Sequence, residues 1–106
     1  MKFGIILQSN EPEKAWNGLR FANTAIKQGH EVKLFLLGAG VEVEATVVDQ
    51  FNVQSQLQDF IAGKGVVMAC GTCLKARHQD ASDMCPISNM LDCVEMVEWA
   101  DKVVTI

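Results

Sequence analysis

The sequence predicts an α/β fold: a single domain, residues 1–106, whose mainly parallel sheet of four or five strands carries helices on both faces. Two observations favour it. Short, almost continuously apolar runs recur along the chain, as is typical of strands buried on both faces. Segments with the apolar spacing of helices lie between these runs, and this alternation indicates a parallel sheet. A length of 106 residues fits one domain.

The first half of the chain supplies two of the predicted strands. Residues 2–8 and 31–37 are nearly continuous apolar runs and are expected to be buried strands. Between them, Asn10 can cap a helix and Pro12 suits its first turn, and apolar residues then recur at helical spacing until Gly29. The region therefore predicts a strand, a helix and a second strand.

The middle of the chain is less uniform. Residues 41–48 alternate valine or alanine with polar residues, which fits a strand, but they also fit a loop with a helical turn. Residues 50–62 have the apolar spacing of a helix, and residues 66–69 form a third buried strand. A short helix is expected over residues 74–78.

The last third of the chain predicts a further helix and a final strand. Pro86 is expected to open the helix, and residues 102–106 form the strand after a turn at Asp101. The apolar residues of this helix are expected to face the core: Ile87, Met90, Leu91, Val94 and Val97.

Composition and charge exclude several classes of protein. The net charge is −4 and the nine basic residues are scattered, which argues against nucleic-acid binding through a basic patch. No segment has the length and apolarity of a signal-peptide core or a membrane span, so no membrane association is expected. We therefore expect a cytoplasmic protein whose four cysteines are thiols, not disulfides.

The candidate site lies where the predicted strands end. In open α/β sheets, functional groups gather beyond the carboxyl ends of the strands, and the loops at residues 8–10, 38–40 and 70–73 leave those ends. Cys70 stands between a strand and a helix, where free amides and positive charge on Lys75 and Arg77 are expected to lower its pKa. Cys70 is therefore a candidate nucleophile, and an inert buried thiol is the alternative.

Four interpretations of the thiols stay open at this point. Cys70 and Cys73, with His78 and Cys85, could provide tetrahedral zinc ligands. The Cys-x-x-Cys spacing also occurs in thioredoxin-like dithiols, although those carry it after an early strand. A cysteine can carry sulfur as a persulfide by chemistry akin to thiol–disulfide exchange. In the fourth interpretation the thiols are incidental to an oligomeric scaffold.

The remaining cysteines have different expected places. Cys85, in a polar loop, is expected to be exposed and could approach the pair as a resolving thiol. Cys93 falls among the apolar positions of the last helix and is expected to be a core residue.

Three stretches of the chain resemble the DsrE/DsrF-like family of small sulfur-relay proteins, which includes TusD-type subunits. The stretch VVMACGTCLKARH is similar to the family's strand, cysteine and short helix. The stretch KFGIILQSNEPEKAWNGLRFANTAIKQGHEVKLFLLGAGV resembles its first strand, helix and second strand, and WADKVVTI resembles its last strand. Cys70 falls on the position of the family's sulfur-accepting cysteine and Arg77 on its basic position, while His78 replaces the usual glycine.

The resemblance implies a DsrE-like α/β subunit that assembles as a homotrimer, a homohexamer or a mixed hexamer, with the reactive cysteine near a subunit junction. It implies relay of sulfane sulfur between donor and acceptor proteins. We expect no cofactor and no bound metal. We therefore predict that Cys70 carries a persulfide and that Cys73 resolves or protects it. The alternative function is a non-catalytic oligomeric or metal-binding module that uses the thiols of Cys70 and Cys73.

Overall fold

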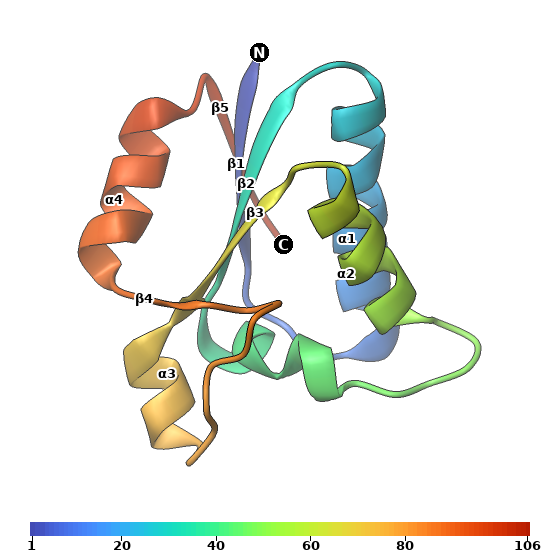
Figure 1. Ribbon diagram of the computed structural model, residues 1–106, viewed down its shortest axis with the longest axis vertical. Helices are drawn as coiled ribbons and strands as arrows, with labels where there is room; N and C mark the ends of the chain where they lie inside the picture. Colours follow the sequence, from blue (N-terminus) through green and yellow to red (C-terminus); the bar gives the residue numbers. More distant parts are fainter.

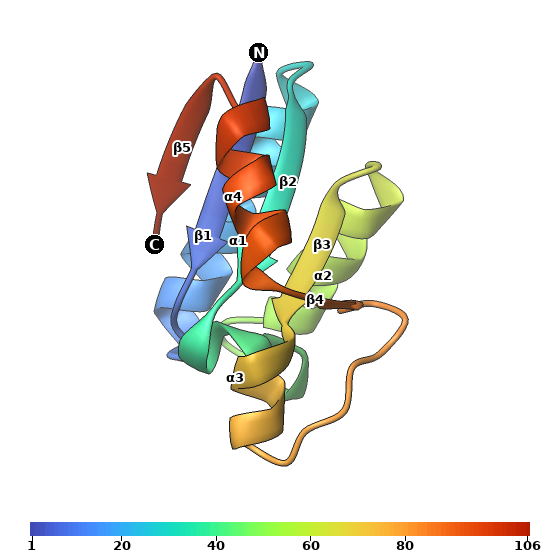
Figure 2. The same ribbon diagram turned by 90° about the vertical axis from the view of Figure 1, so that its left-hand side faces the viewer.

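The computed structural model describes residues 1–106 and contains a five-stranded parallel sheet in the order β4-β3-β2-β1-β5 (Figures 1 and 2). Helices α1 and α2 cover one face of the sheet and α4 covers the other (Figure 1). The predicted α/β fold is therefore confirmed. In chain order the elements are β1 (Lys2–Leu7), α1 (Pro12–Lys27), β2 (Glu31–Leu36), the 3₁₀ helix η1 (Gly38–Ala45), α2 (Val53–Ala62), β3 (Val66–Cys70), α3 (Gly71–Ala76), β4 (Ile87–Ser88), α4 (Met90–Trp99) and β5 (Lys102–Thr105).

The register of the strands brings their carboxyl ends to one edge. Leu7 at the end of β1 pairs with Leu36 at the end of β2, and Leu36 pairs with Ala69 near the end of β3. Because the three strands end together, the loops that follow them begin side by side. The fold therefore places the Cys70 loop beside the loops after β1 and β2, as the sequence predicts.

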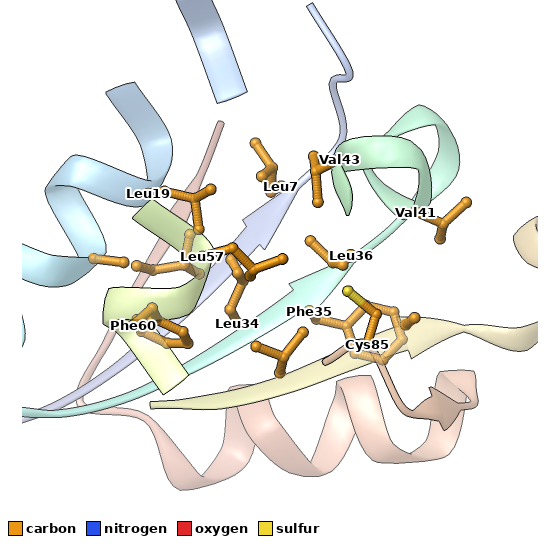
Figure 3. Packing of buried hydrophobic residues seen from close by; sticks show 14 of the residues in the cluster. Leu7, Leu19, Leu34, Phe35, Leu36, Val41, Val43, Leu57, Phe60 and Cys85 are labelled. Carbon is orange, nitrogen blue, oxygen red and sulfur yellow. The ribbon is translucent and has the colours of Figure 1, made fainter. Parts of the chain in front are cut away.

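The face under α1 and α2 contains a closely packed apolar core (Figure 3). Side chains alternate between the two faces of a strand, and those that point toward these helices are fully buried. Fully buried side chains in this layer are Ile5, Leu7, Leu19, Leu34, Leu36, Leu57 and Phe60.

Polar caps move two helix starts from their predicted positions. Glu11, not Asn10, caps α1, because its carboxylate accepts hydrogen bonds from the backbone amides of Glu13 (3.2 Å) and Lys14 (2.9 Å). Helix α2 begins at Val53, later than predicted, because the Asn52 side chain accepts from the Ser55 amide at 2.9 Å. In both cases a side-chain oxygen satisfies free amides of the first turn.

The ambiguous stretch after β2 is helical: η1 spans Gly38–Ala45 and is a 3₁₀ helix. Its start packs tightly on the end of β1. A Cβ atom at Gly40 would lie only 2.0 Å from the carbonyl oxygen of Leu7, so only glycine fits this close approach.

The expected helix start at Pro86 is wrong. Ile87 and Ser88 form β4, which pairs with the end of β3, and α4 begins only at Met90, because the Asn89 side chain accepts from the Asp92 amide at 2.9 Å. A chain held in a strand ladder at residues 87–88 cannot be helical there.

The expected inward face of α4 is also wrong. Helix α4 has two apolar sides, and the side that meets the sheet carries Cys93 (5% exposed) and Met96 (1%). The other side, together with Ile87 at the start of β4, forms what we call the exposed α4 patch: Ile87, Met90, Leu91, Val94 and Val97 are 69%, 55%, 64%, 51% and 42% exposed.

The helices of this chain are amphipathic or short, and none has the length and apolarity required to cross a membrane.

Candidate functional site

Cys70 is the last residue of β3 and immediately precedes α3. Its backbone is extended (φ −60°, ψ 114°), and the helix begins at Gly71, three residues earlier than expected from the sequence. A Cβ atom at Gly71 would lie 3.1 Å from both the Ile87 side chain and the Ser88 carbonyl oxygen. Glycine therefore lets β4 pack directly beside the cysteine, and this contact with β4 holds the strand–helix junction in place.

The Cys70 thiol is sheltered from solvent. The residue is 4% exposed, and the backbone amides of Thr72 and Cys73, in the first turn of α3, lie near its sulfur and act to lower its pKa. Burial and the neighbouring Cys73 thiol raise the pKa of Cys70, and the two amides only partly oppose this rise. The lowered pKa expected from the sequence is wrong, because desolvation of the thiolate outweighs the amides and because neither Lys75 nor Arg77 contributes to the shift.

Cys73 is the more accessible thiol of the pair. It is half-buried, and its sulfur accepts a hydrogen bond of 3.2 Å from the Gly38 amide at the start of η1. The Cys73 thiol, in the first turn of α3, lies close enough to Cys70, the residue before that helix, to influence its pKa. The structure therefore brings together both predicted site residues and adds a backbone donor, Gly38, that sequence patterns cannot identify because it depends on how two loops meet.

Glu42 links the three loops at this edge of the sheet. Its carboxylate accepts a hydrogen bond from the Asn10 side chain and forms an ion pair with Arg77, with a 3.4 Å separation. Arg77 also donates to the Cys73 carbonyl oxygen at 3.3 Å. Arg77, the basic residue singled out in the sequence, therefore stabilises the loops around the site and is not in contact with the Cys70 sulfur.

The expectation that Cys85 is exposed is wrong. The residue is 3% exposed and belongs to the packed layer shown in Figure 3. Burial and the neighbouring Glu44 carboxylate, to which the thiol is hydrogen-bonded, raise the pKa of Cys85 to about 12. Ser82 closes the loop by accepting from the Cys85 amide at 3.1 Å. Cys85 is therefore a protonated structural thiol.

Cys93 is a core residue, as predicted, at 5% exposure. Its environment adds a feature that the sequence did not show. Burial raises the pKa of Cys93, and the neighbouring Cys70 raises it further. The first turn of α4 therefore places a second protonated thiol close to Cys70, on the inner side of the site.

The side chains proposed as zinc ligands do not converge. No group of three or more His, Cys, Asp or Glu side chains is arranged to hold a metal ion. His78 follows the end of α3 in the left-handed conformation (φ 50°), the backbone geometry that usually favours glycine. Its exposed ring lies beyond the helix, while Cys85 is enclosed in the core.

Two hollows of the surface flank the sheet at opposite edges. A hollow of about 360 Å³ lies beside α3, lined by Gly71, His78 and Ile87 among others. A larger one of about 410 Å³ lies at the opposite edge of the sheet, between His30, Lys33 and neighbouring residues. Because Cys70 is 4% exposed, access to its thiol is restricted in the isolated chain.

The comparisons with known proteins agree with this architecture. The DsrE/DsrF-like family matches residues 1–106. The chain belongs to this family. Uncharacterized protein MJ0989 of Methanocaldococcus jannaschii is 36% identical over 99% of both chains. Uncharacterized protein MK0008 of Methanopyrus kandleri is also 36% identical, over 87% of this chain and 81% of its own length.

Solved structures show the same DsrE-like fold. The ychN protein of E. coli superposes with a TM-score of 0.82 and 25% identity, and both chains are covered completely. A conserved protein of unknown function from Bacteroides thetaiotaomicron, BT1422, has a TM-score of 0.78 and 17% identity over 99% of this chain and 94% of its own. The second likeness concerns the fold alone.

Proposed function

We propose that this protein is a sulfur-relay protein that accepts sulfane sulfur as a persulfide on Cys70 and passes it to another thiol. One observation carries the proposal: the neighbouring thiols of Cys70 and Cys73 lie at the carboxyl edge of the sheet, with first-turn amides of α3 near the Cys70 sulfur and the Gly38 amide donating to the Cys73 sulfur. Amides directed at sulfur stabilise negative charge on it, and a thiolate or persulfide anion is the reacting species in sulfur transfer.

Membership of the DsrE/DsrF-like family supports the proposal in a coarser form. Proteins of this family are often related to sulfur relay, and Cys70 occupies the sulfur-accepting position in the resemblance described above. The relatives MJ0989 and MK0008 are uncharacterized, so they add the fold and the family but no reaction.

The burial of Cys70 has two consequences for the chemistry. It excludes water and small thiols from the persulfide, and it keeps the resting thiol protonated because the pKa of Cys70 is raised. A donor must therefore dock closely enough to displace the covering groups before sulfur is exchanged. We infer that sulfur donor and acceptor proteins, and not free small molecules alone, are the partners of this site.

We further propose that copies of the chain cover the exposed α4 patch and form a homotrimer or homohexamer. The patch joins five largely exposed apolar side chains, which is unusual for a surface that stays in water. It starts at Ile87, directly beside Gly71. A second copy seated there would lie next to Cys70, as the family resemblance implies for a reactive cysteine near a subunit junction.

The cytoplasm is the compartment that we propose for this chemistry. All four cysteines are free thiols, and a reducing compartment keeps thiols in that state.

Intact-protein mass spectrometry after incubation with inorganic polysulfide tests the proposed function. Immediately after incubation the wild type is expected to carry added sulfur atoms that a reductant removes, and Cys70→Ser is expected to carry none. Cys93→Ala is the matched control, since it removes an equally buried thiol from the same neighbourhood. Equal sulfur uptake by wild type and Cys70→Ser would overturn the assignment, and a zinc ion retained through Cys70 and Cys73 would favour the metal-binding alternative.

A further inference from the structure

The two thiols of the site are unequal in a way that suits successive roles. Cys70 is 4% exposed and immediately precedes α3. Cys73 is half-buried, lies in the first turn of α3, and accepts a hydrogen bond from the Gly38 amide of a different loop. The two thiols are neighbours across this first turn, close enough for Cys73 to influence the pKa of Cys70, so a persulfide on Cys70 lies near Cys73.

We propose that Cys73 is the resolving thiol of a reductive release step, in which the persulfide on Cys70 leaves as hydrosulfide and the two cysteines form a disulfide. This inference rests on the proposed function. It goes beyond relay, because the sulfur leaves in its fully reduced form instead of passing as sulfane sulfur to an acceptor thiol. The chain would then also supply sulfide to a reaction that consumes it.

The step balances within the site. The Cys73 thiolate attacks the Sγ atom of the Cys70 persulfide, and a bond forms between the two Sγ atoms. The bond between the Cys70 Sγ and the outer sulfur breaks, and its electron pair leaves with the outer sulfur as hydrosulfide. The sulfane sulfur is reduced, and the two cysteine sulfurs are oxidised to the disulfide. A dithiol reductant then returns both cysteines to thiols for the next cycle.

The geometry selects Cys73 over the other two thiols. Cys85 is enclosed and hydrogen-bonded to Glu44 instead of the pair. Cys93 lies near Cys70 but is 5% exposed and has no hydrogen-bond donor directed at its sulfur. Cys73 alone combines proximity to Cys70, partial solvent access and an amide that stabilises its thiolate, the Gly38 N–H at 3.2 Å.

The experiment follows the fate of one sulfur atom. Reduced wild type, Cys73→Ser and the control Cys93→Ala are loaded with inorganic polysulfide without oxygen, desalted, and followed by intact mass while hydrosulfide is measured in the filtrate. We expect wild type and Cys93→Ala to lose the added sulfur, release one hydrosulfide per chain, and end two hydrogens lighter than the reduced protein. Cys73→Ser is expected to keep the added sulfur on Cys70 and to release none. Cys73→Ala is a second variant in case serine disturbs the turn.

The outcomes separate this inference from the proposed function. If wild type holds its added sulfur as long as Cys73→Ser does, Cys70 is a persulfide carrier and the resolving role of Cys73 is wrong. If the sulfur moves to Cys73 as a second persulfide, the attack occurs at the outer sulfur and the release step is again wrong. If neither wild type nor Cys73→Ser takes up sulfur, the proposed function itself fails, and this step fails with it.

Discussion

The helices on the two faces of the sheet bury their apolar side chains to different extents, although both faces are lined with apolar residues. Under α1 and α2, the apolar side chains of helices and strands meet one another and are fully buried. On the other face, α4 turns only Cys93 and Met96 toward the sheet and leaves the exposed α4 patch uncovered. The comparison shows that an apolar side of a helix indicates a surface that packs against something. It does not show whether the covering residues belong to the same chain or to a second copy.

The largest expected difference between the faces comes from a matched pair of leucine deletions. Leu57→Ala, at a residue of α2 that is 0% exposed, is expected to lower the free energy of unfolding by about 2–5 kcal/mol because it leaves a cavity. Leu91→Ala removes the same atoms from a side chain that is 64% exposed, and in the isolated chain it is expected to cost less than ~0.5 kcal/mol.

Urea unfolding at several protein concentrations measures this difference. The cost of Leu57→Ala should stay constant with concentration, while that of Leu91→Ala should grow as copies assemble. If both variants lost the same stability in dilute protein, Leu91 on α4 would be packed within its own chain, and the proposed difference between the two faces would be wrong.

A charge on the exposed α4 patch is expected to disrupt assembly and not the fold. Leu91→Glu places a carboxylate where we propose that a second copy packs, and burying it without a partner is costly. Sedimentation equilibrium should find the wild type as a trimer or hexamer and the variant as a monomer with unchanged circular dichroism. Glu95→Gln, on the same helix but outside the patch, is the control. A wild type that is monomeric at every concentration would contradict the proposed interface.

The dependence of stability on alkaline pH tests the burial of the cysteine thiols. Burial and Glu44 raise the pKa of Cys85 from 9.0 to about 12, so an unfolded chain releases this proton from about pH 9 while the folded chain retains it. Stability is therefore unaffected by this thiol below pH 9 and falls as the pH rises toward 12.

Cys85→Ala should reduce the loss of stability at alkaline pH. Thermal unfolding at a series of pH values from neutral to alkaline measures this loss. Cys70 and Cys93, whose pKa values are also raised, contribute in the same direction, so the stability of the variant still falls with rising pH. A slope unchanged by Cys85→Ala would show that the thiol does not face Glu44 in the folded chain.

Arg77→Ala is expected to have the smallest effect. The half-exposed ion pair with Glu42 spans 3.4 Å, and such pairs contribute about 0.2–1 kcal/mol. Because Arg77 does not contact the Cys70 sulfur, the rate of sulfur uptake from polysulfide should be close to that of wild type. A large fall in that rate, with Lys75→Ala unchanged as control, would restore the direct role expected from the sequence.

The sequence predicted the fold because its strands are short, apolar and separated by amphipathic segments. It also placed Cys70 and Cys73 at the correct edge, since parallel strands that end together bring their loops together. The resemblance of the VVMACGTCLKARH stretch to a known family then pointed to sulfur chemistry, and the family is confirmed over the whole chain.

What the sequence could not show depends on contacts between distant segments. The two-residue strand β4 exists only because residues 87–88 pair with the end of β3, so a local pattern around Pro86 predicts a helix instead. The pKa of Cys70 follows from burial that no spacing of Lys75 or Arg77 reveals. Likewise, the polar loop around Cys85 predicts exposure, but Glu44 and Ser82 close it over the thiol.

Locating the added sulfur on the chain tests the central claim most directly. After polysulfide loading of the Cys73→Ser variant and alkylation, cleavage after lysine and arginine separates Gly65–Lys75, which contains Cys70, from His78–Lys102, which contains Cys85 and Cys93. Fragment mass spectra should place the extra sulfur on Cys70. Extra sulfur on the His78–Lys102 peptide, or on neither peptide, would contradict the proposal that this edge of the sheet carries sulfane sulfur.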